Sequence, residues 1–147
     1  MTTIRINAPE LSRALKLVKH AAGDYYSRPI LCTILFEGDA DGFRLVAADN
    51  YRIGIATIEA SGDVAAFGRV PLPVGELPAV LAVLSGWKDD VQVTLGSDRL
   101  TFATEARSLT VQVMQGTYPA YEQAVAAGAR KDIGINPAFL SDLGKAT

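Results

Sequence analysis

The period of the hydrophobic pattern changes several times in the first half of the chain. Residues 4–6 alternate as Ile-Arg-Ile, which is typical of a short strand. From Leu11 onward the apolar residues recur at intervals of three and four, which predicts a helix with one buried face. Strand-like runs then cover residues 30–37, 43–48 and 51–58, and a Gly-Asp-Ala-Asp-Gly segment between the first two indicates a hairpin. The predicted order is strand, helix and three strands.

The same order recurs after a shift of 66 residues. Ile4 and Ile6 correspond to Val70 and Leu72, and a second helical pattern covers residues 74–84. The strand-like runs that follow it cover residues 91–95, 99–104 and 108–114. Such an internal repeat predicts two similar halves, residues 3–60 and 68–125, of one domain that spans residues 1–128. The expected joint is the segment at residues 60–68, which is rich in small side chains.

The end of the chain resembles its beginning. At a shift of 129 residues, Ile133, Ile135, Asn136, Leu140 and Ser141 match Ile4, Ile6, Asn7, Leu11 and Ser12. We therefore expect residues 129–147 to be a linker and the truncated start of a second domain of the same kind. A helix this short is marginal in isolation, which favours a longer natural protein or a fragment of one. Chance similarity between two short amphipathic stretches is the alternative.

Alternation along the predicted strands indicates antiparallel sheets. Ile34 and Phe36 alternate with Leu35 and Glu37, so we expect the first pair to face the helices and the second pair to face water. Two helices packed on one face of such sheets give a stable layered arrangement. The predicted fold class is α+β.

The first predicted helix has a basic face. Arg13, Lys16 and His20 lie opposite its apolar residues, and Lys19 lies on the flank. These groups suit contact with a phosphate backbone, although a basic helical face is also common as an ordinary solvated surface. The second helical pattern, residues 74–84, contains no basic residue. Any nucleic-acid contact should therefore be concentrated on the first helix.

Composition limits what the chain can do. Its formal net charge is −2, from 14 basic and 16 acidic residues, whereas proteins that bind nucleic acid strongly and independently are usually basic. There is no apolar run of about 18 residues, so we expect no membrane span. The N-terminus lacks the layout of a signal peptide and Cys32 is the only cysteine, which together favour a cytoplasmic protein.

Catalytic and metal-binding patterns are scarce in the sequence. His20 is the only histidine, and Cys32 has no thiol or histidine neighbour. No glycine-rich phosphate loop is present. Asp39 and Asp41 lack the other ligands of a calcium loop, so a polar hairpin tip is the better interpretation. We therefore predict no cofactor, no metal and no enzymatic activity, and a catalytic role ranks last among the alternatives.

Three stretches together resemble one known family. They are Arg-Pro-Ile-Leu-Cys-Thr-Ile-Leu-Phe-Glu at residues 28–37, Ala-Ala-Asp-Asn-Tyr-Arg-Ile-Gly-Ile at residues 47–55, and Met-Gln-Gly-Thr-Tyr-Pro-Ala-Tyr at residues 114–121. In this order and spacing they are similar to the central domain of the bacterial sliding clamp, the beta subunit of DNA polymerase III. The similarity covers approximately residues 3–125.

The resemblance implies a DNA-clamp fold with two copies of strand, helix and three strands, with helices lining a channel and sheets outside. It implies a ring of six such domains from two chains, which encircles duplex DNA and tethers a polymerase. Arg13, Lys16, Lys19 and His20 would then face the DNA. The implied partners are duplex DNA, DNA polymerase, clamp-loader subunits and a second copy of the full-length protein. The alternative is a clamp-like regulatory protein that forms no ring.

The resemblance also implies a pocket that binds short peptides of polymerases and clamp loaders. The positions that match this pocket are Arg28, Leu31, Asn50, Tyr51, Arg52, Ile53, Pro119, Gln123 and Ala124. Leu31, Ile53 and Pro119 would form an apolar floor. The alternative is that Leu31 and Ile53 are ordinary core residues. This chain departs from the usual family residues at Ala48, Asn50, Tyr51, Ala120, Gln123 and Ala124, which bears on the identity of the partner.

Overall fold

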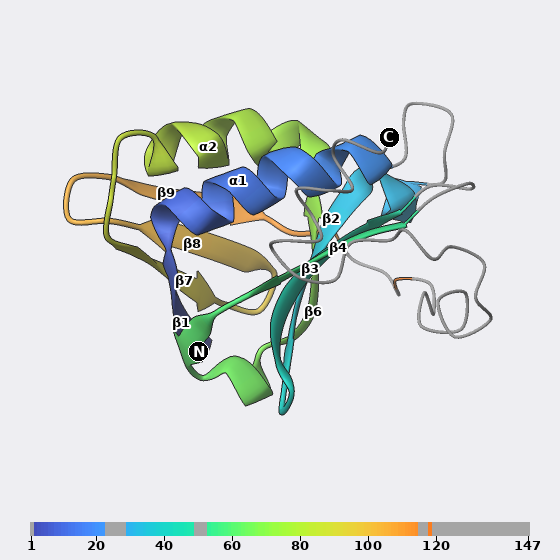
Figure 1. The fold of residues 1–147 in the computed structure, drawn as a ribbon, viewed down its shortest axis with the longest axis horizontal. Coiled ribbons are helices and arrows are strands. Elements are labelled where there is room, and N and C mark those ends of the chain that lie inside the picture. The colour runs from blue at the N-terminus through green and yellow to red at the C-terminus, as the bar shows by residue number, and fades with distance from the viewer. Residues whose placement is uncertain (1, 23–28, 49–52, 115–117, 119–147) are drawn as a thin grey trace.

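The computed structural model describes residues 2–22, 29–48, 53–114 and 118, and Figure 1 shows two helices lying side by side above two sheets. The first half contains β1 (Thr2–Asn7), α1 (Ala8–Val18), β2 (Thr33–Asp39), β3 (Gly42–Ala48) and β4 (Ile53–Ile58). The second half contains β6 (Gly68–Pro73), α2 (Leu77–Leu84), β7 (Asp90–Leu95), β8 (Arg99–Ala103) and β9 (Ser108–Gln112). This order confirms the predicted repeat of strand, helix and three strands.

Short elements connect the main ones. The strand β5 (Ala60–Gly62) lies between the halves, and four 3-10 helices are described: η1 (Lys19–Ala21), η2 (Pro29–Cys32), η3 (Val64–Ala66) and η4 (Val74–Glu76). α1 begins at Ala8 and is capped by Asn7, whose side-chain Oδ1 accepts a hydrogen bond from the Glu10 backbone N–H at 3.0 Å. This bond satisfies one of the backbone N–H groups of the first turn that have no partner within the helix. Pro9, in the same turn, has no backbone N–H and needs no partner.

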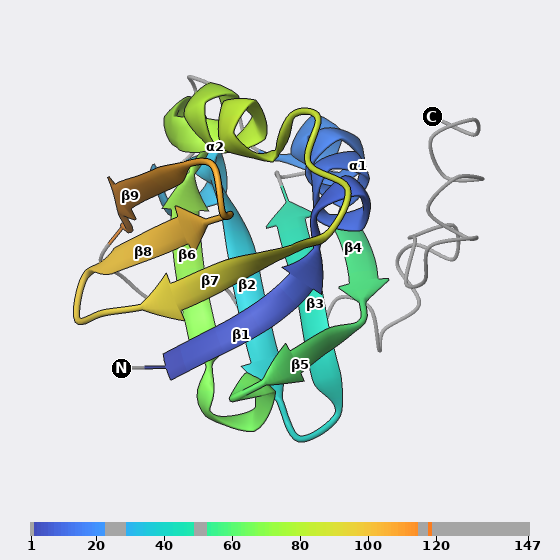
Figure 2. The same ribbon diagram turned by 90° about the vertical axis from the view of Figure 1, so that its left-hand side faces the viewer.

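The two halves exchange their first strands. One sheet has the order β5-β1-β7-β8-β9 and the other has the order β4-β3-β2-β6, and every pairing is antiparallel. β1 therefore lies beside β7 of the second half, and β6 lies beside β2 of the first half. Figure 2 shows one sheet in front of the other, with the strands crossing and both helices above them. Each sheet depends on both halves, so the repeat forms one interlocked domain.

The strand register is equivalent in the two sheets. Ile4 of β1 pairs with Val93 of β7, and Val70 of β6 pairs with Phe36 of β2. Each pair belongs to a row of paired residues that runs across its sheet. In the five-stranded sheet the row continues from Val93 to Phe102 and Leu109. In the four-stranded sheet it continues from Phe36 to Leu45 and Ala56. Ile4 and Val70, which correspond in the sequence repeat, thus occupy equivalent places in an approximately two-fold arrangement. The register confirms the repeat found in the sequence.

The core lies between the two sheets and the helices. The apolar face of α1 is buried as predicted, with Leu11, Leu15 and Val18 at most 1% exposed. Phe36 and Phe43 of the four-stranded sheet contact each other edge to face, with ring centroids 6.0 Å apart. Aromatic pairs in this geometry stabilise a core beyond the area that they bury.

Two sequence expectations were wrong. Residues 30–32 were predicted as strand but belong to η2, where Pro29 lacks a backbone N–H and the Thr33 hydroxyl donates to the Ile30 carbonyl at 2.6 Å. The joint at residues 60–68 lies between the halves as expected, and it also contains the strand β5, which pairs with β1. It is three residues long, too short to produce a recognisable alternating pattern.

The second correction concerns the outer face of β2. Leu35 and Glu37 were expected to face water, yet Leu35 is 0% exposed and Glu37 is 4% exposed. Leu35 packs in a second apolar cluster with Val46, Ile55 and Tyr118. Glu37 is covered by arginines from the neighbouring strands. Both outward positions of β2 are therefore covered, in part by residues distant in sequence such as Tyr118 and Arg69.

Candidate nucleic-acid and partner-binding surfaces

The basic face of the first helix is exposed as predicted. Arg13 and Lys16 lie on α1, and Lys19 and His20 lie on η1, which continues it. All four residues are exposed, and they lie away from the buried apolar face of the helix. The structure therefore confirms that these cations are accessible on one surface, and their contact with DNA remains a prediction.

A groove of about 850 Å³ lies between the two helices. α1 and α2 run side by side in opposite directions (Figure 1). The residues that line this groove, which we call the interhelical groove, are Pro9, Ser12, Arg13, Lys16, Leu17, Leu81, Ala82, Leu84, Ser85, Gly86, Trp87 and Lys88. Three of them are cations and none is an acid. Of the predicted DNA-facing residues, Arg13 and Lys16 line this groove, whereas Lys19 and His20 do not.

The C-terminal end of α2 is capped by a distant arginine. The guanidinium Nη1 of Arg107 donates to the carbonyl oxygen of Ala82 at 2.6 Å and to that of Ser85 at 3.2 Å. The last carbonyls of a helix have no partner within the helix and carry a partial negative charge. Sequence analysis did not single out Arg107, because it comes from the turn between β8 and β9 and is remote from α2 in sequence.

The predicted peptide pocket is only partly visible. Arg28, Asn50, Tyr51, Arg52, Pro119, Gln123 and Ala124 lie outside the described residues. Leu31 belongs to η2, and Ile53 begins β4. Ile53 is half-buried and packs on the apolar cluster of Leu35, Val46, Ile55 and Tyr118. This buried cluster thus supports Ile53 from within the fold, which sequence reasoning had not found.

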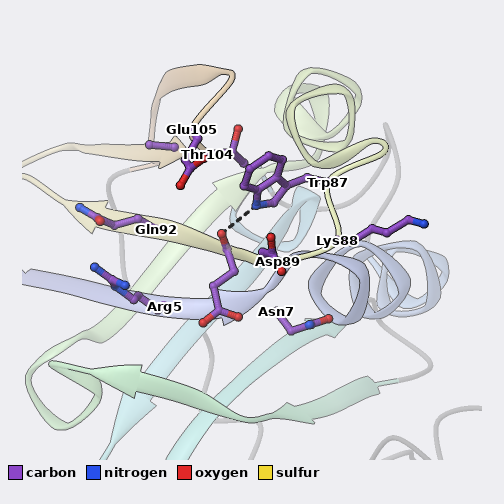
Figure 3. Close-up of a pocket in the computed structure, with 10 residues that line it drawn as sticks. Arg5, Asn7, Trp87, Lys88, Asp89, Gln92, Thr104 and Glu105 are labelled. Atoms are coloured by element: carbon purple, nitrogen blue, oxygen red, sulfur yellow. Dashed lines mark hydrogen bonds between the residues drawn. The ribbon is translucent and has the colours of Figure 1, made fainter.

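A second, polar hollow lies at the end of the five-stranded sheet (Figure 3). It has a volume of about 570 Å³, and its walls come from the end of β1, the segment between α2 and β7, and the end of β8. The indole Nε1 of Trp87 donates to the carbonyl oxygen of Asp90 at 2.9 Å and fixes one wall. The lining combines Arg5 and Lys88 with Asp89, Asp90 and Glu105, so it favours neither sign of charge.

A charge network lies on the outer face of the four-stranded sheet. Both carboxylate oxygens of Glu37 are paired, one with Arg44 Nε at 2.8 Å and the other with Arg69 Nε at 2.5 Å. Arg44 also binds Asp39 at the hairpin tip. This hydrogen bond from Arg44 is the main reason that the pKa of Asp39 lies below its ordinary value. The backbone N–H of Asp41 also donates to Asp39, so the tip is a polar turn, as predicted.

Within the described ranges, no group of three histidine, cysteine, aspartate or glutamate side chains is placed to hold a metal ion. No described helix is long and apolar enough to cross a bilayer. Two hollows and one helix face therefore stand out on the described surface: the basic face of α1, the interhelical groove that it borders, and the polar hollow around Trp87.

Comparison with known proteins places this arrangement in a family. No curated protein matches the sequence significantly. Among solved structures, the DNA polymerase III subunit beta of Pseudomonas aeruginosa is 21% identical with a TM-score of 0.74, and the alignment covers 84% of this chain and 34% of that one. The sliding clamp of Bartonella birtlesii, solved with griselimycin bound, is 25% identical with a TM-score of 0.75, covering 83% of this chain and 34% of that one.

These likenesses show the fold, and this chain spans about a third of the length of the solved clamps. The family model of the central domain of the DNA polymerase III beta subunit matches residues 5–120, which is most of the sequence. It covers both halves of the interlocked repeat, including α1, α2 and the strands of both sheets. The chain therefore belongs to the DNA polymerase III beta subunit family, in which it corresponds to the central domain.

Proposed function

We propose that the chain is a domain of a DNA sliding clamp, which helps to encircle duplex DNA and to hold a polymerase on it. The observation that carries this proposal is the position of both helices on one side of two interlocked sheets, with the exposed cations of α1 on that side. Contact with the phosphate backbone requires positive charge but no base readout, so it permits sliding along any sequence. A net charge of −2 is compatible with such weak contact.

The gain from a clamp comes from tethering. A polymerase held on a closed ring stays at high effective concentration near the DNA without a tight contact of its own. The domain is accordingly proposed as a non-catalytic accessory part of the replication machinery, acting in the cytoplasm at the nucleoid. The ring would be closed by further domains and a second copy of the full-length protein.

Polymerase and clamp-loader peptides are proposed to dock beside Ile53. The apolar cluster of Leu35, Val46, Ile55 and Tyr118 supports this position, because it provides a fixed apolar base under the start of β4. Arg52 and Leu31 would contribute the polar rim and a further apolar contact. Substitution of either residue by alanine should weaken binding of a polymerase peptide, and unchanged affinity in both variants would remove the pocket from the proposal.

The ring is tested on the whole gene product. We expect light scattering to give the mass of a closed dimer, and the loaded protein to remain on nicked circular DNA but to leave linear DNA through its ends. A monomer that is retained on neither DNA would contradict the clamp and support the alternative of a regulator that forms no ring.

A further inference from the structure

The two sides of the interhelical groove differ in positive charge. α1 contributes Arg13 and Lys16, whereas α2 has no cation between Leu77 and Leu84. We propose that Lys88 and Arg107 adapt the α2 side of the groove to the phosphate backbone of duplex DNA, with Lys88 as a phosphate contact and Arg107 as a positioning residue. This inference rests on the proposed function and names residues that the predicted DNA-facing set does not contain.

Without Arg107, the C-terminal end of α2 would repel an anion in the groove. Ala82 and Ser85 line the groove, and their carbonyl oxygens lie at the C-terminal end of the helix. The partial negative charge of a helix is concentrated at this end and acts over about one turn. A phosphate approaching the groove would be repelled by these carbonyls if they were free.

Arg107 removes this obstacle from outside the helix. Its guanidinium binds both carbonyl oxygens, and its backbone is held in a tight turn with Thr104. In that turn the Thr104 N–H donates to the Arg107 carbonyl at 2.8 Å, and the Arg107 N–H donates to the Thr104 hydroxyl at 3.0 Å. Because these two hydrogen bonds fix the backbone of the turn, the guanidinium is held at the C-terminal end of α2.

Lys88 provides the cation that α2 lacks. Its neighbours are anchored, since Trp87 bonds to Asp90 and the Asp89 carbonyl accepts from the Ala8 N–H at the start of α1. In Figure 3 the Lys88 side chain points away from Arg5 and extends over α1. Lys88 therefore lines the groove together with the two cations of α1.

No acid lines the interhelical groove itself. Asp89 and Asp90 follow Lys88 directly and share the polar hollow around Trp87 with it, but neither of them lines the groove. Three cations thus surround a groove without a carboxylate, in a chain whose acids outnumber its bases. This local charge matches a polyanion.

Lys88 is tested by titrating the 147-residue chain with linear duplex DNA at several salt concentrations. Trp87 is the only tryptophan and lines the groove, so its fluorescence reports binding. Each phosphate that is neutralised contributes about 0.9 to the slope of log K against log salt. We expect Lys88→Ala to lower the magnitude of the slope by about this amount, and Arg99→Ala, which removes one exposed charge from β8, to leave it unchanged.

The outcomes separate the inference from the proposed function. Equal slopes for Lys88→Ala and Arg99→Ala, with clear binding by the unmodified chain, would overturn the assignment of Lys88 and leave the DNA contact standing. Absence of any salt-dependent binding by the unmodified chain would overturn this inference, whereas the proposed clamp would be overturned only if the full-length protein were not retained on nicked circular DNA.

Arg107 needs a readout that separates binding from folding. Arg107→Gln keeps a donor for one carbonyl and removes the charge, and we expect it to weaken DNA binding by about two- to fivefold at low salt, the range given by helix-dipole effects. The affinity is measured below the thermal transition of each variant, where each is fully folded by circular dichroism. A lowered melting temperature with unchanged affinity would show that Arg107 serves only to stabilise α2.

Discussion

Phe36 of β2 and Phe102 of β8 meet edge to face, with ring centroids 6.0 Å apart and planes inclined by 73°. Both side chains are 0% exposed, and they belong to different sheets. Phe36 stands in the row that contains Val70, and Phe102 stands in the row that contains Ile4. The contact thus joins the two corresponding rows of the repeat at the centre of the core.

Truncation of this contact should therefore be costly. We expect Phe102→Ala to lower the free energy of unfolding by about 3–5 kcal/mol, because it removes a fully buried ring and leaves a cavity between the sheets. Urea denaturation measures the loss. Leu109→Ala, at a half-buried position of the edge strand β9, is the control and should cost clearly less. Similar losses in both variants would contradict the central position of Phe102.

The approach of η3 to β2 makes a second prediction. A Cβ added at Gly38 would lie 2.6 Å from the carbonyl oxygen of Val64 and 2.9 Å from the Cβ of Phe67. Gly38→Ala must displace this segment, and we expect a loss of about 1–3 kcal/mol in the free energy of unfolding. Gly75 has no atom within 4 Å of an added Cβ. Gly75→Ala should be neutral or stabilising by about 0.4–1 kcal/mol, and an equal loss in both variants would refute the steric explanation.

The buried carboxylate of Glu37 supports the outer face of the four-stranded sheet. Glu37→Ala leaves Arg44 and Arg69 without their shared partner, and we expect a loss of about 1.5–3 kcal/mol, the range for hydrogen bonds to charged groups. Glu59→Ala removes an exposed carboxylate and should change stability by at most about 0.5 kcal/mol. Chemical denaturation measures the free energy of unfolding of both variants. A Glu37 variant as stable as the Glu59 variant would contradict a stabilising role of the charge network.

Asp39 should make the stability of the fold sensitive to acid. Its pKa is lowered in the folded state by Arg44, so its stabilising effect is fully present above the ordinary aspartate pKa of about 3.9 and is lost as the pH falls below it. We expect Asp39→Asn to be less stable than the unmodified protein at pH 7. The difference should shrink as the pH falls through this range. Urea unfolding across pH measures it, and a difference independent of pH would contradict the role of the ionised carboxylate.

The order of elements could be predicted from sequence because each change of period is local. The repeat strengthened that prediction, since Ile4 and Val70 begin similar patterns independently. The burial of Leu35 could not be predicted in the same way. Its cover includes Tyr118, which is far away in the chain, and an alternating strand pattern contains no information about such a partner.

The basic face of α1 was likewise predictable, because helical geometry alone brings Arg13 and Lys16 together. The groove that they line was not. It requires α2 to run beside α1, and it includes Lys88 and a helix end capped by Arg107, which are distant from one another in sequence. Local patterns thus identified the cations of one helix, whereas the tertiary fold determined what surrounds them.

The most direct test of the DNA-facing surface is a titration of the isotope-labelled chain with duplex DNA, followed by backbone amide chemical shifts in nuclear magnetic resonance spectra. We predict that shift changes concentrate on α1, on η1 and at Lys88, and that they diminish as salt is added. Amides of Arg5 and Gln92 on the five-stranded sheet should remain unchanged. Shift changes centred on that sheet, or the absence of any change at low salt, would contradict the account.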